Sequence, residues 1–135
     1  MPDSLLPKPF SFQEAKLKSP LALAYLGDTV WDLLIRQRLL AGALPAGALH
    51  RRAILLANAG AQAEAAARIE PLLSPEEADV LRRGQNAHAH HRAPKNQDPV
   101  DYSRATGLEA LMGYLYLTGQ TARIAELFDI GVPIL

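Results

Sequence analysis

The sequence has 135 residues, equal numbers of basic and acidic side chains, and no cysteine. The missing cysteines exclude disulfides and thiolate metal sites, and the zero net charge means that any binding of nucleic acid must depend on how charge is distributed. No apolar run approaches the ~20 residues that span a membrane. We therefore expect one domain (residues 1–135, core about 19–130) without a membrane partner, in the cytoplasm.

Capping residues predict where the helices lie. Ser19, Ser74 and Asp98 are each followed by proline, a combination typical of a helix N-terminus. Helical spacing of apolar residues and the terminating glycines and prolines then predict an all-α fold with five helices. The first helix is predicted over about 20–40. The second follows the loop that contains Gly47 and runs to about Ile69. The other three are predicted over 75–84, 98–119 and 121–130. Residues 85–97 are predicted to form one long loop.

Two of these helices carry an isolated carboxylate beside a glycine in an apolar stretch. Asp28 follows Gly27, and Glu109 lies two residues after Gly107. Carboxylates are seldom buried without a partner, and a glycine inside a helix costs about 1 kcal/mol relative to alanine. A chain that accepts both costs twice is expected to gain a function. We expect the two acids to hold a divalent cation to which a phosphate backbone can come close.

Asp32 lies one turn after Asp28 on the same helix face. The favoured interpretation is a salt bridge with Arg36, four residues further on. The alternative is that Asp32 orients Asp28 or holds a water molecule on the metal.

Basic residues gather in residues 80–97, which contain no aspartate or glutamate. We expect this segment to contact RNA phosphates without reading sequence, although a solvated loop is the alternative. A zinc site built from its closely spaced histidines is disfavoured, because no cysteine or nearby carboxylate completes a tetrahedral set. His50 and Arg51, in the second predicted helix, are either surface residues or an extension of the same RNA-contacting surface.

The first long helix carries apolar residues on most sides, more than one small core needs to cover. Part of this surface is therefore predicted to seal a two-fold dimer. The residues concerned are Leu21, Leu23, Tyr25, Leu26, Val30, Trp31, Leu34 and Ile35.

Several segments together resemble the ribonuclease III catalytic domain. Leu-Ala-Tyr-Leu-Gly-Asp-Thr-Val-Trp-Asp (23–32) is similar to the signature helix of that family, and Thr-Gly-Leu-Glu-Ala-Leu-Met-Gly-Tyr-Leu-Tyr-Leu (106–117) is nearly the family pattern. Residues 49–52, 81–87 and 94–96 continue the likeness in the same order and spacing. The resemblance covers about residues 19–128 and is strongest to the Mini-III branch, which lacks the usual double-stranded-RNA-binding domain. The chain also ends where that branch ends.

The resemblance implies a single ribonuclease-III-like helical endonuclease domain with Asp28 and Glu109 as catalytic residues and metal ligands. Two acids of the full family pattern are missing, since Ala24 and Thr106 stand at their positions, and the Mini-III branch lacks the same two. Asp32 and Thr106 are the candidates for a supporting role beside the metal. Mg²⁺, with Mn²⁺ as a substitute, remains compatible with two carboxylates because Mg²⁺ usually keeps several waters.

The resemblance also implies a substrate and partners. The enzyme would be a homodimer that cleaves double-stranded RNA, leaves 5′-phosphate and 3′-hydroxyl ends, and matures the 23S ribosomal RNA precursor, with a ribosomal protein as a further candidate partner. The candidate RNA-binding residues are His50, Arg51, Arg82, Arg83, Asn86, His88, Arg92, Lys95 and Asn96.

Two alternatives remain open at this point. One is a non-catalytic module of the same fold that dimerises and binds RNA, against which the retained Asp28 and Glu109 argue. The other is a helical protein–protein interaction domain whose charged stretches lie on the surface. Magnesium-dependent cleavage of duplex RNA separates the enzyme from both.

Overall fold

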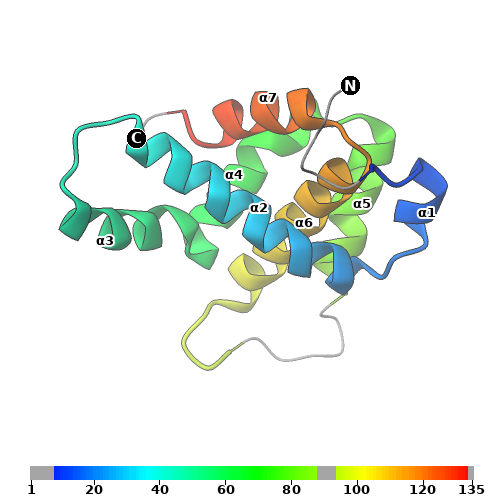
Figure 1. The fold of residues 1–135 in the computed structure, drawn as a ribbon. Coiled ribbons are helices and arrows are strands. Elements are labelled where there is room, and N and C mark those ends of the chain that lie inside the picture. Colours follow the sequence, from blue (N-terminus) through cyan, green and yellow to red (C-terminus); the bar gives the residue numbers. More distant parts are fainter. Residues whose placement is uncertain (1–7, 88–93, 134–135) are drawn as a thin grey trace, which may run out of the picture.

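The computed structural model describes residues 8–87 and 94–133. Within these residues there are seven α-helices and one 3₁₀ turn but no β-strand, which confirms the predicted all-α fold (Figure 1). The elements are α1 (Phe12–Lys16), α2 (Pro20–Leu40), α3 (Ala46–Ala57), α4 (Ala59–Ile69), the 3₁₀ turn η1 (Glu70–Leu72), α5 (Pro75–Asn86), α6 (Pro99–Leu117) and α7 (Thr121–Gly131). No helix in this described part of the chain is long and apolar enough to cross a membrane.

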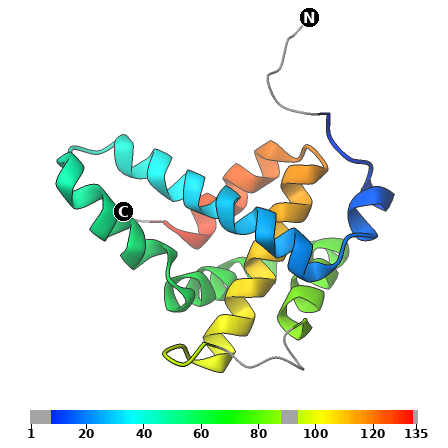
Figure 2. The ribbon, with the colours of Figure 1, turned by 60° about the horizontal axis from the view of Figure 1, so that its bottom comes forward.

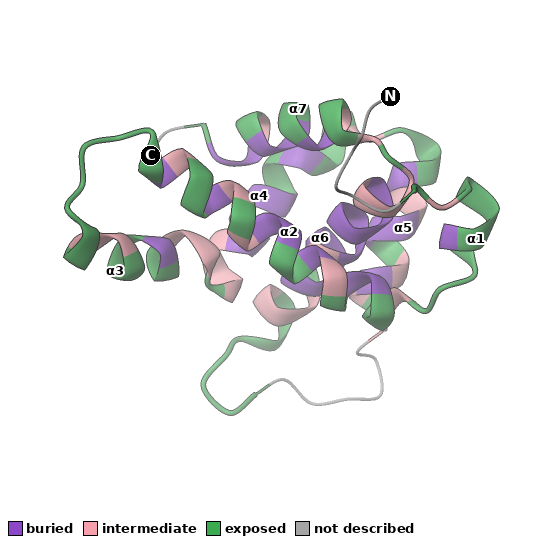
Figure 3. Cartoon of the chain, in the orientation of Figure 1, coloured by how far each residue is buried: buried purple, intermediate pink, exposed green. Residues whose placement is uncertain are grey.

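Helix α6 is the centre of the molecule. Helix α2 crosses it, and α4 and α5 also pack against it, while α7 contacts both α4 and α6 (Figures 1 and 2). The stretches from Ala105 to Leu108 and from Ala110 to Leu115 are buried, which accounts for the mostly buried α6 in Figure 3. Helix α3 is the opposite case, because Ala53 is its one buried residue.

The predicted helix starts are confirmed by hydrogen bonds close in sequence. The Ser19 hydroxyl accepts from the Ala22 amide at 3.1 Å, and Ser74 and Glu77 form a reciprocal capping box. The Asp98 carboxylate accepts from the Val100 and Asp101 amides at 2.8 and 3.0 Å. These bonds satisfy amides that have no partner inside their own helix, so local sequence is enough to position the starts.

Helix α1 was not predicted, although its start has the same signal. Ser11 and Glu14 form a capping box, and the Phe10 amide donates to the Leu117 carbonyl at 2.5 Å. Ala15 is fully buried, so this short helix is held by packing against the bundle. Only five residues long, it is too short to be stable by itself.

The prediction of one helix reaching Ile69 from the loop after α2 was wrong, because the chain breaks at Asn58. Asn58 has an extended backbone (ψ 166°), and its side-chain oxygen accepts from the Ala61 amide at 2.8 Å. An asparagine side chain competes with the helical hydrogen bonds of the backbone, and here it starts a new helix. The break lets α4 pack against α6 while α3 stays exposed.

The predicted end of the next helix at Gly84 was also wrong, since α5 continues to Asn86. Gly84 is instead where α5 and α6 approach most closely. A Cβ atom there would lie 2.8 Å from both the Gly107 Cα and the Ala110 Cβ. The glycine serves helix packing and not helix termination.

Candidate active site

The crossing of α2 over α6 is made possible by two glycines. A Cβ atom on Gly27 would lie 1.6 Å from the Glu109 carbonyl oxygen, and one on Gly113 would lie 2.0 Å from the Leu23 carbonyl oxygen. Any side chain at either position would force the helices apart. The glycine beside Asp28 therefore brings the backbones of the two helices into contact, and the residues next to it come together.

Asp28 and Glu109 meet at this crossing, as predicted. Asp28 is exposed on α2, Glu109 is half-buried on α6, and their side chains are joined by a hydrogen bond. Burial, and then the hydrogen bond and the negative charge of Asp28, raise the pKa of Glu109 to about 8. Two carboxylates this close can both ionise at neutral pH only at a large cost, so the free pair retains a proton.

The donor set fits a divalent cation such as Mg²⁺. A cation between the carboxylates would take the place of the proton, and hard oxygen ligands are those that Mg²⁺ prefers. Among the described residues, no group of three or more histidine, cysteine, aspartate or glutamate side chains is placed to hold a metal. Two carboxylates suffice for Mg²⁺, since waters and substrate phosphates complete its coordination.

Gln62, which the sequence analysis missed, is a third member of the site. It lies on α4, is 3% exposed, and hydrogen-bonds the Glu109 carboxylate, a contact that acts to lower the pKa of Glu109. Its signal in the sequence was a single amide in a run of alanines, on the same side of the helix as Ala66 and Ile69, both of which are buried. Three helices therefore contribute to the site.

The two supporting candidates have other contacts. Asp32 forms the predicted salt bridge, with its Oδ2 atom 2.9 Å from Arg36 Nε, and both side chains are partly exposed. The buried Thr106 donates a hydrogen bond from its hydroxyl to the Tyr102 carbonyl at 2.9 Å. Ala24, at the other position where the family pattern has an acid, is buried against the core.

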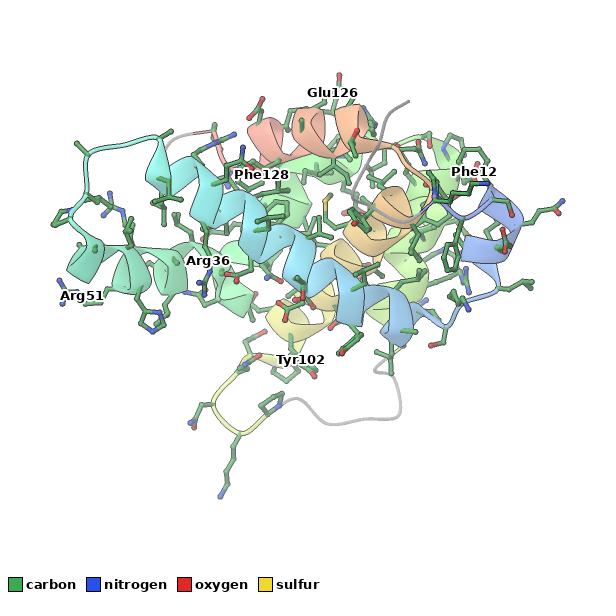
Figure 4. All side chains as sticks on the ribbon, in the orientation of Figure 1. Phe12, Arg36, Arg51, Tyr102, Glu126 and Phe128 are labelled. Carbon is green, nitrogen blue, oxygen red and sulfur yellow. The ribbon has the colours of Figure 1, made fainter. Side chains whose placement is uncertain are left out.

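The candidate RNA-binding residues fall into groups on either side of the α2–α6 crossing (Figures 1 and 2). Arg82, Arg83 and Asn86 are in the last turns of α5, while His50 and Arg51 are exposed on α3, where Figure 4 shows Arg51 on the outer part of the helix. Arg82 forms a salt bridge with Asp79. The remaining candidates are in the connection from α5 to α6, where Lys95 and Asn96 are exposed and His88 and Arg92 lie outside the described residues.

Segment 96–98 is placed against the junction of α3 and α4. Asn96, Gln97 and Asp98 line a hollow together with Asn58, Ala59 and Gly60. The connection before α6 therefore reaches the inner end of α3. In the same region Figure 4 shows Tyr102 near the start of α6.

Comparison with known proteins assigns the fold to a family. The model of the ribonuclease III domain matches residues 21–120. A Mini-ribonuclease 3 of Symbiobacterium thermophilum is 48% identical over 111 residues, which cover 82% of this chain and 85% of that protein. A Mini-ribonuclease 3 of Brevibacillus brevis is 42% identical over 116 residues, covering 85% of this chain and 86% of the relative.

A crystal structure of a Fusobacterium nucleatum protein has the same fold, with a TM-score of 0.79 at 28% identity, covering 89% of this chain and 96% of that one. The fold and the matches together define the class of protein as an endoribonuclease. The chain belongs to the ribonuclease III family, in its Mini-ribonuclease 3 branch.

Proposed function

We propose that this endoribonuclease cleaves double-stranded RNA with a divalent metal ion held by Asp28 and Glu109. The observation that carries the proposal is the carboxylate pair at the α2–α6 crossing, where the pKa of Glu109 is raised to about 8. An acid pair that retains a proton at neutral pH is destabilised when both members are charged, and a bound cation relieves that repulsion. Mg²⁺ is the proposed metal and Mn²⁺ its substitute.

The two acids have different surroundings, which suit different tasks. Asp28 is exposed, so it can hold a metal ion where an RNA phosphate also reaches it. Glu109 is half-buried and is hydrogen-bonded by Gln62, so its carboxylate would be a ligand of fixed orientation. When bound, the metal ion would activate a water molecule for in-line attack and stabilise charge on the departing 3′-oxygen, leaving 5′-phosphate and 3′-hydroxyl ends.

The proposed substrate is the 23S ribosomal RNA precursor in the cytoplasm, which agrees with membership of the Mini-ribonuclease 3 branch. Duplex RNA is recognised mainly through its shape, its 2′-hydroxyls and its phosphates. The basic residues on either side of the crossing, including Arg83 and Lys95, are suited to phosphate contacts. A ribosomal protein bound to the same RNA is a further proposed partner.

We also propose that the enzyme is a homodimer, with part of α2 in the interface. Half of the predicted apolar set, Leu23, Val30, Trp31 and Ile35, is buried in the core of the chain itself. Tyr25 and Leu21, one turn apart, remain 84% and 39% exposed. A second copy would cover these side chains and place two active sites on one duplex. Light scattering at micromolar concentration should report about twice the chain mass of 14.6 kDa, and a monomer would contradict this part of the proposal.

The decisive experiment is a gel assay on a duplex RNA with Mg²⁺ and with EDTA. Cleavage in Mg²⁺ that EDTA abolishes is the expected result. Salt-sensitive binding of the duplex without cleavage in any divalent metal would instead favour the RNA-binding module.

A further inference from the structure

Gln62 is one of three polar or charged residues that are buried in the described part of the chain. A buried amide group normally has hydrogen-bond partners, because leaving one unpaired costs about 1–3 kcal/mol. For Gln62 the partners join three helices, since the Nε2 atom donates to the Ala57 carbonyl at 3.2 Å and the side chain also hydrogen-bonds Glu109. Ala57 is the last residue of α3, and Glu109 is in the middle of α6.

Both bonds can be made by the same nitrogen atom. A side-chain amide nitrogen carries two hydrogens, and a carboxylate and a carbonyl can only accept. One hydrogen is donated to the Ala57 carbonyl at the end of α3, which leaves the second available for Glu109. The first bond fixes the rotation of the amide group, so the second approaches the carboxylate from a set direction.

The break at Asn58 makes this arrangement possible. Asn58 ends α3 and caps α4, so the carbonyl at the end of α3 comes within reach of a side chain from the first turn of α4. The same break turns α4 onto α6, where Gln62 meets Glu109.

An amide is suited to this position because it is neutral. A lysine or arginine would neutralise the acid pair and compete with a metal ion, as Arg123 neutralises Glu77 elsewhere in the fold. An aliphatic side chain would leave the inner side of the carboxylate without a donor. A glutamine orients the carboxylate and preserves its charge for a metal.

We propose that Gln62 is a positioning residue that holds the Glu109 carboxylate in the orientation needed to bind a divalent metal ion. This inference rests on the proposed function of Asp28 and Glu109. Helix α4 then contributes a residue to the metal site, and the hydrogen bond to the Ala57 carbonyl holds the side chain of that residue in place.

The test compares the wild-type protein with Gln62→Met, which preserves side-chain length and removes the donor. Mn²⁺ binding is measured by electron paramagnetic resonance without RNA, and kcat and KM are measured on a duplex RNA. We expect a Kd for Mn²⁺ about 10- to 100-fold higher, as for other residues that orient metal ligands. We also expect a similar fall in kcat and an unchanged KM for RNA.

Gln120→Met is the matched control, because Gln120 is a half-buried amide that donates to Thr118 at 2.8 Å, beyond the far end of α6. It should leave Mn²⁺ binding and kcat unchanged. Wild-type Mn²⁺ affinity and kcat in Gln62→Met would overturn the inference, even if that variant unfolds at a lower temperature. A wild-type protein that neither binds Mn²⁺ nor cleaves duplex RNA would overturn the proposed function as well.

If Gln62→Met does not fold, the side-chain amide signals of Gln62 provide the answer without metal or RNA. Between the wild-type protein and Glu109→Gln, nuclear magnetic resonance should show one amide proton of Gln62 shifted, because its acceptor changes from a carboxyl to an amide group. The other amide proton, which is donated to the Ala57 carbonyl, should be nearly unchanged. Two unshifted signals would overturn the inference.

Discussion

Two pairs of acidic side chains, Glu76 with Glu77 on α5 and Asp28 on α2 with Glu109 on α6, have opposite surroundings. Glu76 accepts a hydrogen bond from the Tyr114 hydroxyl at 2.5 Å and pairs with Lys16, while Glu77 pairs with Arg123 at 2.8 Å. Among the described residues, no lysine, arginine or histidine forms a salt bridge with Asp28 or Glu109. Asp28 and Glu109 contact each other, and Glu109 also contacts Gln62.

The electrostatic consequences differ accordingly. The Tyr114 hydroxyl and then Lys16 lower the pKa of Glu76, and Arg123 lowers that of Glu77. Burial and Asp28 raise the pKa of Glu109 to about 8. The first pair is neutralised within the protein and joins helices, whereas the second requires a proton or an external cation. The missing counter-charge, more than the acids themselves, therefore distinguishes the candidate site.

The largest effect is expected from removing one charge of the unpaired acids. Asp28→Asn and Glu109→Gln preserve the shape of the side chain but weaken metal binding, so cleavage of duplex RNA in Mg²⁺ should fall by at least about 100-fold. Folding and RNA binding should be nearly unchanged. Glu126→Gln, an exposed acid paired with Arg123, is the control. Cleavage by Asp28→Asn at the wild-type rate would refute the catalytic assignment.

A substitution in the neutralised pair, Glu76 and Glu77, should instead reduce stability and leave activity nearly unchanged. Glu77→Gln leaves Arg123 without its buried partner, which should lower the free energy of unfolding by about 2–4 kcal/mol. The rate of cleavage at low temperature should stay near the wild-type value, because Glu77 is not at the site. Urea denaturation together with the gel assay checks both parts. A loss of activity without a loss of stability would contradict the assignment of Glu77 to the fold and not to the active site.

The raised pKa of Glu109 predicts how metal-free stability changes with pH. Between pH 4.5 and about 8 the unfolded chain releases the Glu109 proton while the folded protein retains it. The folded protein then binds more protons, so stability falls as pH rises through this window. The Tm of the wild-type protein in EDTA should therefore fall by at least about 4 °C more than that of Glu109→Gln. Parallel Tm curves for the two proteins would show that Glu109 ionises normally.

Smaller effects are expected from the basic residues. Neutralising Arg83 and Lys95 together should weaken binding of duplex RNA broadly across sequences. For each lost contact, the magnitude of the slope of log K against log salt should fall by about 0.9. Arg82→Met should have less effect, because Asp79 already pairs with Arg82. The slopes are measured by gel shift at several salt concentrations. Equal slopes in the double variant and the wild type would leave these residues as solvated surface.

The smallest effect is expected for Asp32→Asn. The exposed pair with Arg36 contributes about 0.3–0.5 kcal/mol, and its loss should reduce cleavage by no more than about threefold. Measured beside Asp28→Asn, this variant shows whether a carboxylate one turn away contributes to the metal site. A reduction as large as that of Asp28→Asn would give Asp32 a direct role.

Much of the fold could be predicted because its signals are local. Ser19, Ser74 and Asp98 bond amides two or three residues away, and Gly119 ends α6 with a positive φ of 75°. The acid pair could also be predicted, because an isolated carboxylate in an apolar helix needs a partner. The meeting of Asp28 and Glu109 agrees with the resemblance of residues 23–32 and 106–117 to the ribonuclease III family.

The sequence alone was enough to predict the starts of α2, α5 and α6, the all-α class and the two acids, since each depends on neighbours within a turn or on the cost of burying charge. The break at Asn58 is also local, because its side chain caps α4 at the Ala61 amide, although the prediction missed it. The tertiary structure was needed to show that Gly84 packs against α6 and that Gln62 reaches Glu109. Both of these outcomes depend on contacts between segments far apart in the chain. Helical periodicity cannot show them, because it places a residue on one face of a helix without indicating what that face meets.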